Sequence, residues 1–312
     1  MITIAQYSKG ERREWNEFLD DSKNGLFLFN RNYMEYHSNR FVDLSLMFYE
    51  GNKLIALLPA NITDNILISH EGLTFGGFII NSKMNTSLML TVFDELKQYL
   101  SQRHIDKLVY KCIPHTYHSK PSEEDRYALF RHNAKLIRRE VTTTVQLTDE
   151  VKFQSIRRRQ IKKAESAAMK TKQVNDFEFF WKILEENLRK TYDTKPAHSL
   201  AEIEYLQSKF PDNIRLFASY VGGIMLAGVV IYESNHVAHA QYIASSDKDT
   251  NGGSLDVLFA YLINDYYKGK KKYFDFGIST EKGGRFLNKG LIFFKEGFGA
   301  SAVVHDIYEI HT

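Results

Sequence analysis

Candidate catalytic residues gather where an aromatic strand ends near the C-terminus. The run Tyr-Phe-Asp-Phe-Gly places Asp275 at the end of the strand, immediately before a turn at Gly277. A carboxylate there either caps the turn or orients an amine and takes its proton. Beyond the turn, a glycine-punctuated loop carries Glu281 and Arg285, which are either solvated or in contact with a ligand. We take Asp275 and Glu281 as candidate catalytic residues and Arg285 as a candidate substrate-binding residue.

A second candidate is a lysine surrounded by aromatic residues. Lys295 lies among Phe293, Phe294 and Phe298, just before the turn Gly-Phe-Gly. An exposed lysine is the usual outcome for this residue type. A lysine among aromatic rings can instead meet an anion, so Lys295 is also a candidate catalytic residue.

The run Val-Ala-His-Ala-Gln-Tyr-Ile-Ala reads as a strand with several polar side chains. Strict alternation sends His239 and Gln241 to one face and Tyr242 to the other. We predict that Gln241 and Tyr242 line a substrate site and that His239 is a buried, satisfied histidine. The histidine spacing does not match a zinc site, so no metal is expected.

A basic segment lies near the middle of the chain. Residues 151–172 contain neither Gly nor Pro and carry apolar residues among many charges, which predicts one long helix. Such a run is either a solvated face or an anion-binding one. Arg158 and Arg159 are the best phosphate contacts, either to a nucleotide-sugar pyrophosphate or to tRNA.

Composition limits the class of protein. The 312 residues are 43% hydrophobic and 25% charged, which is typical of globular proteins, and the length favours two domains. The net charge of +3 does not by itself indicate a nucleic-acid binder. The single cysteine excludes an intrachain disulfide. No secretion signal and no apolar run of about 18 residues are seen, so we expect a cytoplasmic protein without a membrane span.

A repeated order of elements indicates two similar units. Residues 43–61 read as strand, glycine turn, strand, and residues 213–232 repeat this pattern around Gly222 and Gly223. A third strand, a helix and a short strand follow in each copy. These are expected at 66–80, 87–103 and 107–111 in the first copy, and at 237–245, 254–267 and 273–276 in the second. We therefore predict two α/β (α+β) domains, residues 1–149 and 150–312, each a mixed, mostly antiparallel sheet flanked by helices.

The motifs of the second copy resemble a known family. The strand ending Asp-Phe-Gly, the later Phe-Lys-x-x-Phe-Gly at 294–299 and the basic Arg-Arg-Arg-Gln-Ile-Lys-Lys-Ala at 157–164 are similar to the Fem-type branch of the GNAT acyltransferases. That branch includes the peptidoglycan bridge aminoacyltransferases and has tandem GNAT-like domains. The match is specific mainly over residues 239–310, and the coiled-coil arm of some members has no counterpart.

The resemblance implies roles for particular residues. In GNAT enzymes the pyrophosphate of the acyl donor binds where a strand leads into a helix N-terminus, here residues 245–254. Ser245, Gly252, Gly253 and Ser254 are thus candidate donor contacts, although an ordinary strand-to-helix turn explains them equally well. The usual glycine pattern is absent, and Asp247 and Asp249 would repel a phosphate. For Lys295, the resemblance implies stabilisation of a developing oxyanion.

Together these observations predict a metal-independent N-acyltransferase whose active site lies in the second domain. The preferred donor is acetyl-CoA or another acyl-CoA, and the preferred acceptor is an amine of a nucleotide-linked sugar or related cell-envelope polysaccharide precursor. Two alternatives stay open. One is aminoacyl transfer from aminoacyl-tRNA to a peptidoglycan precursor, and the other is a non-catalytic ligand-binding protein on the same scaffold.

Overall fold

The computed structural model describes residues 1–250 and 252–312 and divides into two units. The first unit comprises Met1–Glu140, Gly283–Arg285 and Val304–Thr312, and the second comprises Val141–Lys282 and Phe286–Val303. The division therefore lies at Glu140 rather than at residue 149, and the C-terminal segment belongs to the first unit. Two long strands explain the difference, because β9 (Lys135–Gln146) and β17 (Ser301–His311) each begin in one unit and end in the other.

The first unit contains two groups of strands. Strands β1, β3, β4 and β7 form an antiparallel sheet in that order, while β6 pairs with β5 on one side and in parallel with β8 on the other. Its elements are β1 (Ile2–Gln6), α1 (Arg12–Asp20), α2 (Arg31–Met34), β2 (Val42–Asp43), β3 (Leu46–Glu50), β4 (Lys53–Leu58), β5 (Asn61–Thr63), β6 (Ile66–Ile68), β7 (Ile79–Ile80), α3 (Thr86–Ser101), β8 (Lys107–Lys111) and α4 (Glu124–Arg131). The strand expected over 66–80 is thus two short strands, β6 and β7, separated by a loop.

The second unit is built on a sheet in the order β10-β11-β12-β13-β14-β9, in which only β13 and β14 run parallel. Its elements are α5 (Ser155–Ser166), β10 (Lys170–Val174), α6 (Phe177–Tyr192), α7 (Leu200–Lys209), β11 (Ile214–Val221), β12 (Ile224–Glu233), β13 (Val237–Ser245), α8 (Ser254–Tyr261), β14 (Tyr273–Ile278), β15 (Thr280–Glu281), β16 (Phe286–Leu287) and α9 (Lys289–Glu296). The hairpin turn between β11 and β12 uses Gly222 and Gly223 at positive φ, as the sequence predicted.

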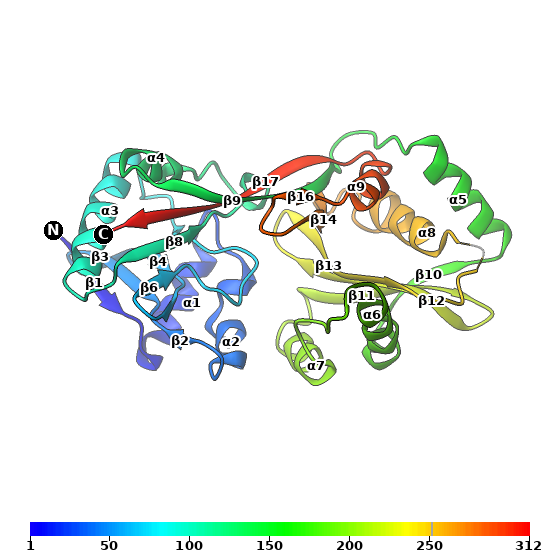
Figure 1. Cartoon of the computed structure of the whole chain (residues 1–312), viewed down its shortest axis with the longest axis horizontal. Coiled ribbons are helices and arrows are strands. Elements are labelled where there is room, and N and C mark those ends of the chain that lie inside the picture. The colour runs from blue at the N-terminus through cyan, green and yellow to red at the C-terminus, as the bar shows by residue number, and fades with distance from the viewer. Residues whose placement is uncertain (251) are drawn as a thin grey trace. The chain divides into compact units, whose positions relative to one another are not determined.

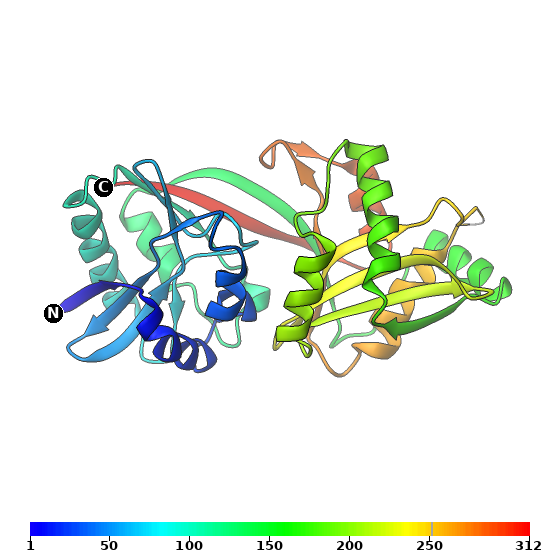
Figure 2. The same ribbon diagram turned by 90° about the horizontal axis from the view of Figure 1, so that it is seen from below.

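Helices cover both faces of this second sheet. In Figure 1, α6 and α7 lie on one face of strands β11 to β13, and α8 lies on the other with α5 beyond it. Figure 2, seen from below, shows α6 and α7 crossing in front of the strands. The α8 face is packed by apolar side chains that include Phe259, Phe274, Phe276 and Phe298. The predicted α/β architecture of sheets flanked by helices is confirmed.

The basic segment differs from the prediction of one long helix. Helix α5 ends at Ser166, Ala168 adopts a positive φ of 55°, and the chain then forms strand β10 from Lys170. β10 pairs along its whole length with β11, so sheet hydrogen bonds outweigh the local helix pattern there. The described residues contain no helix long and apolar enough to cross a membrane.

Candidate active site

The two parallel strands of the second unit separate after a short stretch of pairing. Registered pairs between β13 and β14 join Val237, Ala238 and His239 to Tyr273, Phe274 and Asp275, and no further pair is found between the described residues of these strands. Because β13 continues to Ser245, its later backbone groups on that edge have no ladder partner in β14. Backbone N–H and C=O groups at such a sheet opening can form hydrogen bonds with a substrate.

The final pair at this opening consists of two ionisable side chains. Asp275 is completely buried, and its Oδ2 lies 3.3 Å from Nδ1 of His239, which is 9% exposed. Asp275 also accepts hydrogen bonds from the Thr142 hydroxyl and, at 2.8 Å, from the Gly277 N–H. A hydrogen bond from Nδ1–H to the carboxylate fixes the histidine tautomer and leaves the lone pair on Nε2.

Sequence reasoning identified Asp275 but treated His239 as an ordinary core histidine. The missing information was the parallel register of β13 and β14, which brings residues 36 positions apart into one pair. Gly277 completes the arrangement with a φ of +75°, which lets its N–H turn back to the carboxylate. A Cβ atom added at Gly277 would lie 3.6 Å from Cε1 of His239, so the turn also borders the imidazole ring.

The first unit has a corresponding strand pair without these side chains. Strands β6 and β8 are also parallel and are also registered over three residues, ending with Ile68 opposite Val109. The position equivalent to His239 and Asp275 is therefore occupied by two hydrocarbon side chains, which cannot transfer a proton. This difference supports the expectation that the chemistry lies in the second unit.

Lys295 is buried rather than exposed, with 2% of its surface accessible. Its ammonium donates hydrogen bonds of 2.8 Å to the carbonyl oxygens of Gly277 and Ile278. Burial lowers the pKa of Lys295 to about 8, and the nearby Asp275 carboxylate opposes that shift. Lys295 thus holds the turn that follows Asp275 and places a positive charge close to the His239–Asp275 pair.

The other residues predicted in this region, Glu281 and Arg285, lie in and beside the β15–β16 hairpin. Glu281 lies in β15, opposite Phe286, and its Oε1 accepts a 3.0 Å hydrogen bond from the Asn288 side chain. Arg285 is exposed on the turn before β16. Neither makes a described contact with Asp275 or Lys295, so their predicted roles remain untested.

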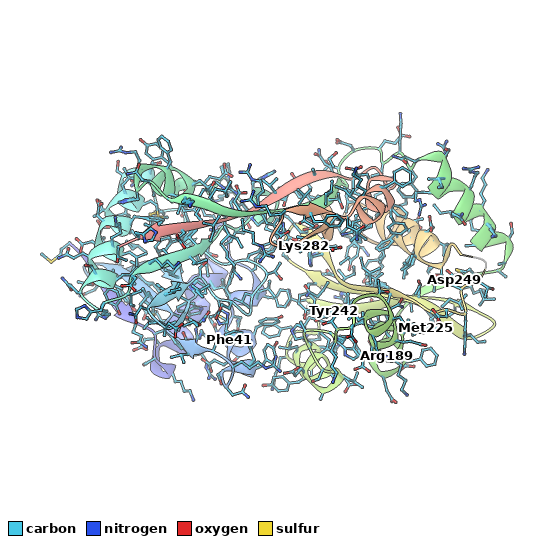
Figure 3. The ribbon with its side chains drawn as sticks, viewed as in Figure 1. Phe41, Arg189, Met225, Tyr242, Asp249 and Lys282 are labelled. Carbon is cyan, nitrogen blue, oxygen red and sulfur yellow. The ribbon has the colours of Figure 1, made fainter. Side chains whose placement is uncertain are left out.

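Strict alternation in β13 is wrong. The register with β12 shifts so that Val230 faces Tyr242 and Ile231 faces Ala240, which leaves Gln241 as the extra residue of a bulge. Tyr242 is buried on the α6 face (Figure 3). Its ring lies 5.1 Å from that of Trp181, and its hydroxyl is bonded to Nδ1 of His198. The bulge is adjacent to the point where β13 leaves β14, and bulges of this kind often lie next to active sites.

In the predicted donor loop, the side chain of an aspartate lies at the N-terminus of helix α8. Gly252 and Gly253 adopt positive φ values, and Ser254 begins α8, as expected. However, the Asp249 carboxylate accepts hydrogen bonds from Ser254 at its backbone N (3.2 Å) and hydroxyl (2.6 Å). Figure 3 shows Asp249 beside the loop before α8. In this arrangement the residues do not fit a pyrophosphate, because a carboxylate already occupies the helix N-terminus.

Two further points concern this loop. Ser245 ends β13, and its carbonyl accepts a hydrogen bond from the Asn187 side chain of α6. Asn251, within the predicted loop 245–254, lies outside the described residues. Among the residues described, no group of His, Cys, Asp and Glu side chains is arranged to hold a metal ion.

The arginines of the basic helix α5 lie in two different environments, one buried and one exposed. Arg157 is buried and forms a 2.9 Å ion pair with Asp256 of α8, and its guanidinium lies 4.8 Å from the Phe294 ring centroid. Arg158 and Arg159 are exposed. Arg158 borders a groove of about 650 Å³ that also touches Ile161, Glu165 and Tyr261. Neither Asp275 nor Lys295 lines this groove, so the predicted phosphate contacts and the catalytic candidates do not share it.

Replacing Arg157 by methionine should lower the free energy of unfolding by about 3–5 kcal/mol, because Asp256 would be left buried without its partner. Burial already raises the pKa of Asp256 to about 6 against the attraction of Arg157. The matched control Arg159→Met should stay within about 0.5 kcal/mol of the parent in denaturant titration. Equal stabilities of the two variants would contradict a structural role for Arg157.

Two parallel strands that separate beside a bulged strand, followed by a helix, agree with the GNAT-like fold that the sequence predicted. Residues 152–285 match the family model described as an acetyltransferase (GNAT) domain. This matched segment is a GNAT acetyltransferase domain, and the protein is an N-acyltransferase. No curated protein sequence matches the chain significantly.

Solved structures share the fold across nearly the whole chain. A crystal structure of FemX has a TM-score of 0.68 at 10% identity and covers 97% of this chain and 96% of its own. The structure of L-PGS from Bacillus licheniformis has a TM-score of 0.61 at 14% identity, covering 95% and 90%. A tandem GNAT protein from the clavulanic acid biosynthesis pathway has a TM-score of 0.55 at 10% identity, covering 100% and 98%. The Fem-type, tandem GNAT-like fold predicted from the sequence is confirmed.

Proposed function

We propose that this N-acyltransferase moves an aminoacyl group from aminoacyl-tRNA to an amine of a cell-envelope precursor. The observation that carries the transfer chemistry is the His239–Asp275 pair at the opening between β13 and β14. The similarity in fold to FemX and to L-PGS favours the envelope as the setting. The cytoplasm, where charged tRNA is available, is the proposed location.

The proposed reaction is a direct transfer without a covalent enzyme intermediate. The acceptor amine binds at the opening and loses a proton to Nε2 of His239 as it attacks the carbonyl carbon of the donor ester. Asp275 stabilises the imidazolium that forms. Lys295 contributes positive charge near the oxyanion, as the family resemblance implied, while its carbonyl partners keep the turn in place. Collapse of the tetrahedral intermediate breaks the ester bond, and protonated His239 returns its proton to the leaving oxygen, which is released as the tRNA hydroxyl.

Two observations favour tRNA as the donor over a CoA thioester. The first is the Asp249 carboxylate at the N-terminus of α8, where a pyrophosphate would be repelled. The second is the charge of α5, on which Arg158, Arg159, Lys162 and Lys163 are all exposed against one exposed acid, Glu165. A polyanion gains from such a row of cations through the release of counterions.

The donor proposal predicts a salt-dependent complex with charged tRNA. The triple variant Arg158→Ala/Arg159→Ala/Lys162→Ala should weaken binding of bulk charged tRNA about 10- to 100-fold at low salt, measured by fluorescence anisotropy. It should also reduce the slope of log K against log salt by about 2–3. The matched control Lys268→Ala/Lys270→Ala/Lys272→Ala removes the same charge from exposed positions after α8 and should bind like the parent.

An acyl-CoA donor is the second candidate, favoured by the acetyltransferase description of the matching family model and by the positive φ of Gly252 and Gly253. It requires Asp249 to leave the helix N-terminus. Under this candidate, Asp249→Ser should strengthen acetyl-CoA binding in calorimetric titration. If the parent binds acetyl-CoA and ignores charged tRNA, the tRNA proposal fails and the CoA candidate replaces it.

A further inference from the structure

Exposed apolar side chains concentrate in one short segment. Twelve large hydrophobic residues are exposed in the described chain, and four of them fall between residues 278 and 293. They are Ile278 (41% exposed), Phe286 (49%), Leu287 (40%) and Phe293 (53%). Single exposed apolar residues are common on protein surfaces, but a concentration of this kind marks an interaction surface.

Phe286 and Leu287 project from an ordered hairpin. Strand β15 pairs with β16 through Thr280 opposite Leu287 and Glu281 opposite Phe286, and these two form their own sheet in the part of the chain that is described. The Asn288 N–H donates a 2.9 Å hydrogen bond to the Ser279 carbonyl at the base of the hairpin. Neighbouring residues of a strand point to opposite faces, so this thin element exposes hydrocarbon on both sides.

Exposed cationic residues flank these apolar residues in the chain. Lys282 and Lys289 are exposed on either side of β16, and Phe286 directly follows the exposed Arg285 in the chain. The Lys282 ammonium lies 5.8 Å from the centroid of the Phe286 ring. The acid of this segment before α9, Glu281, accepts a hydrogen bond from Asn288. Aromatic and aliphatic side chains interleaved with cations match the interface of an anionic bilayer, where apolar groups enter the acyl boundary and cations meet phosphates.

We propose that the β15–β16 hairpin docks this enzyme on an anionic membrane surface by inserting Phe286 and Leu287 among the lipid headgroups. The turn of the hairpin packs against the β9 backbone at Arg139, and the exposed cations beside Phe286 and Leu287 match anionic lipid headgroups better than an apolar protein surface. Lys295 bonds to the carbonyl of Ile278, two residues before β15, so docking brings the candidate site close to the bilayer surface. The proposal goes beyond the proposed function, and its test requires no activity.

The test is vesicle flotation of the full chain. Vesicles of phosphatidylcholine with about a third phosphatidylglycerol should carry the parent, whereas pure phosphatidylcholine vesicles should carry much less, because each cation near an anionic surface adds to binding. Phe286→Ser/Leu287→Ser should weaken partitioning about ten-fold or more. Phe130→Ser, which removes a phenylalanine that is 75% exposed on α4, is the matched control and should partition like the parent.

A second readout does not depend on the double variant folding. Phe286→Trp should show a blue-shifted emission on addition of the anionic vesicles and should be quenched by brominated lipid, since Trp15 and Trp181 are both buried and should not respond. A parent that does not float, equal binding to the two vesicle types, or an unquenched tryptophan at 286 would each overturn the proposal. Concentration-dependent dimerisation abolished by Phe286→Ser/Leu287→Ser, without flotation of the parent, would assign the hairpin to contact between copies instead.

Discussion

Asp275→Asn should reduce turnover about 10³- to 10⁴-fold in single-turnover transfer from charged tRNA. The asparagine retains the size of the carboxylate but removes the charge that stabilises protonated His239. An amide also presents an N–H group to Nδ1, which favours the tautomer without a lone pair on Nε2. The assay follows a radiolabelled aminoacyl group from bulk charged tRNA onto the amine of a nucleotide-linked muropeptide precursor.

Two controls separate chemistry from folding. His198→Asn removes another buried histidine of the second unit, one that bonds to Tyr242, and should lower stability while leaving turnover at saturation close to that of the parent. The double variant Asp275→Asn/His239→Gln should be about as slow as the worse single variant, because the pair acts as a unit. Multiplicative losses in the double variant would show that the two residues act separately.

Lys295→Met should lower turnover about 100-fold or more, because it removes the positive charge beside the pair. Since the side chain is buried and bonded to two carbonyl groups, the variant should also lose about 1–3 kcal/mol of stability. Lys295→Arg, which keeps the charge, should recover part of the turnover. Thermal unfolding of each variant shows how much of the loss is due to stability.

The pH dependence gives an independent test of Lys295. Because burial lowers its pKa to about 8, the ammonium is present below that pH and is lost as the pH rises through it. Turnover of the parent should therefore fall above about pH 8, and Lys295→Arg should move this limb to higher pH, since arginine stays charged. If turnover of Lys295→Arg falls over the same pH range as that of the parent, the ionisation belongs to another group.

The sequence predicted the elements whose signals are local. Both glycine-turn hairpins, the helix α3 and the strands β8 and β13 lie close to the expected positions, because their periodicity and turn residues agree with the tertiary structure. Asp275 was found by the same kind of local signal, a polar residue between a strand and a glycine turn. These features also carried the family resemblance, which the fold confirms.

What the sequence did not reveal depends on contacts between distant segments. The start of β10 was predicted to be helical because it directly follows the helical pattern of α5. Its pairing with β11, which the sequence does not reveal, makes it a strand. The bulge at Gln241 has no signature in the run Val-Ala-His-Ala-Gln-Tyr. His239 became a catalytic candidate only when the parallel register placed it beside Asp275. Arg157 and Arg159 look alike in the sequence, yet one is buried against Asp256 and the other is exposed.

The most direct test of the account is chemical rescue at His239. In His239→Ala, turnover of the labelled aminoacyl transfer should fall about 10²- to 10⁴-fold. Added imidazole should raise the turnover of this variant at least about ten-fold, in proportion to the concentration of unprotonated imidazole. The small base fills the space beside Asp275 and accepts the proton of the amine. A His239→Ala protein that transfers the aminoacyl group at the parental rate without imidazole would contradict the assignment of the His239–Asp275 pair as the catalytic centre.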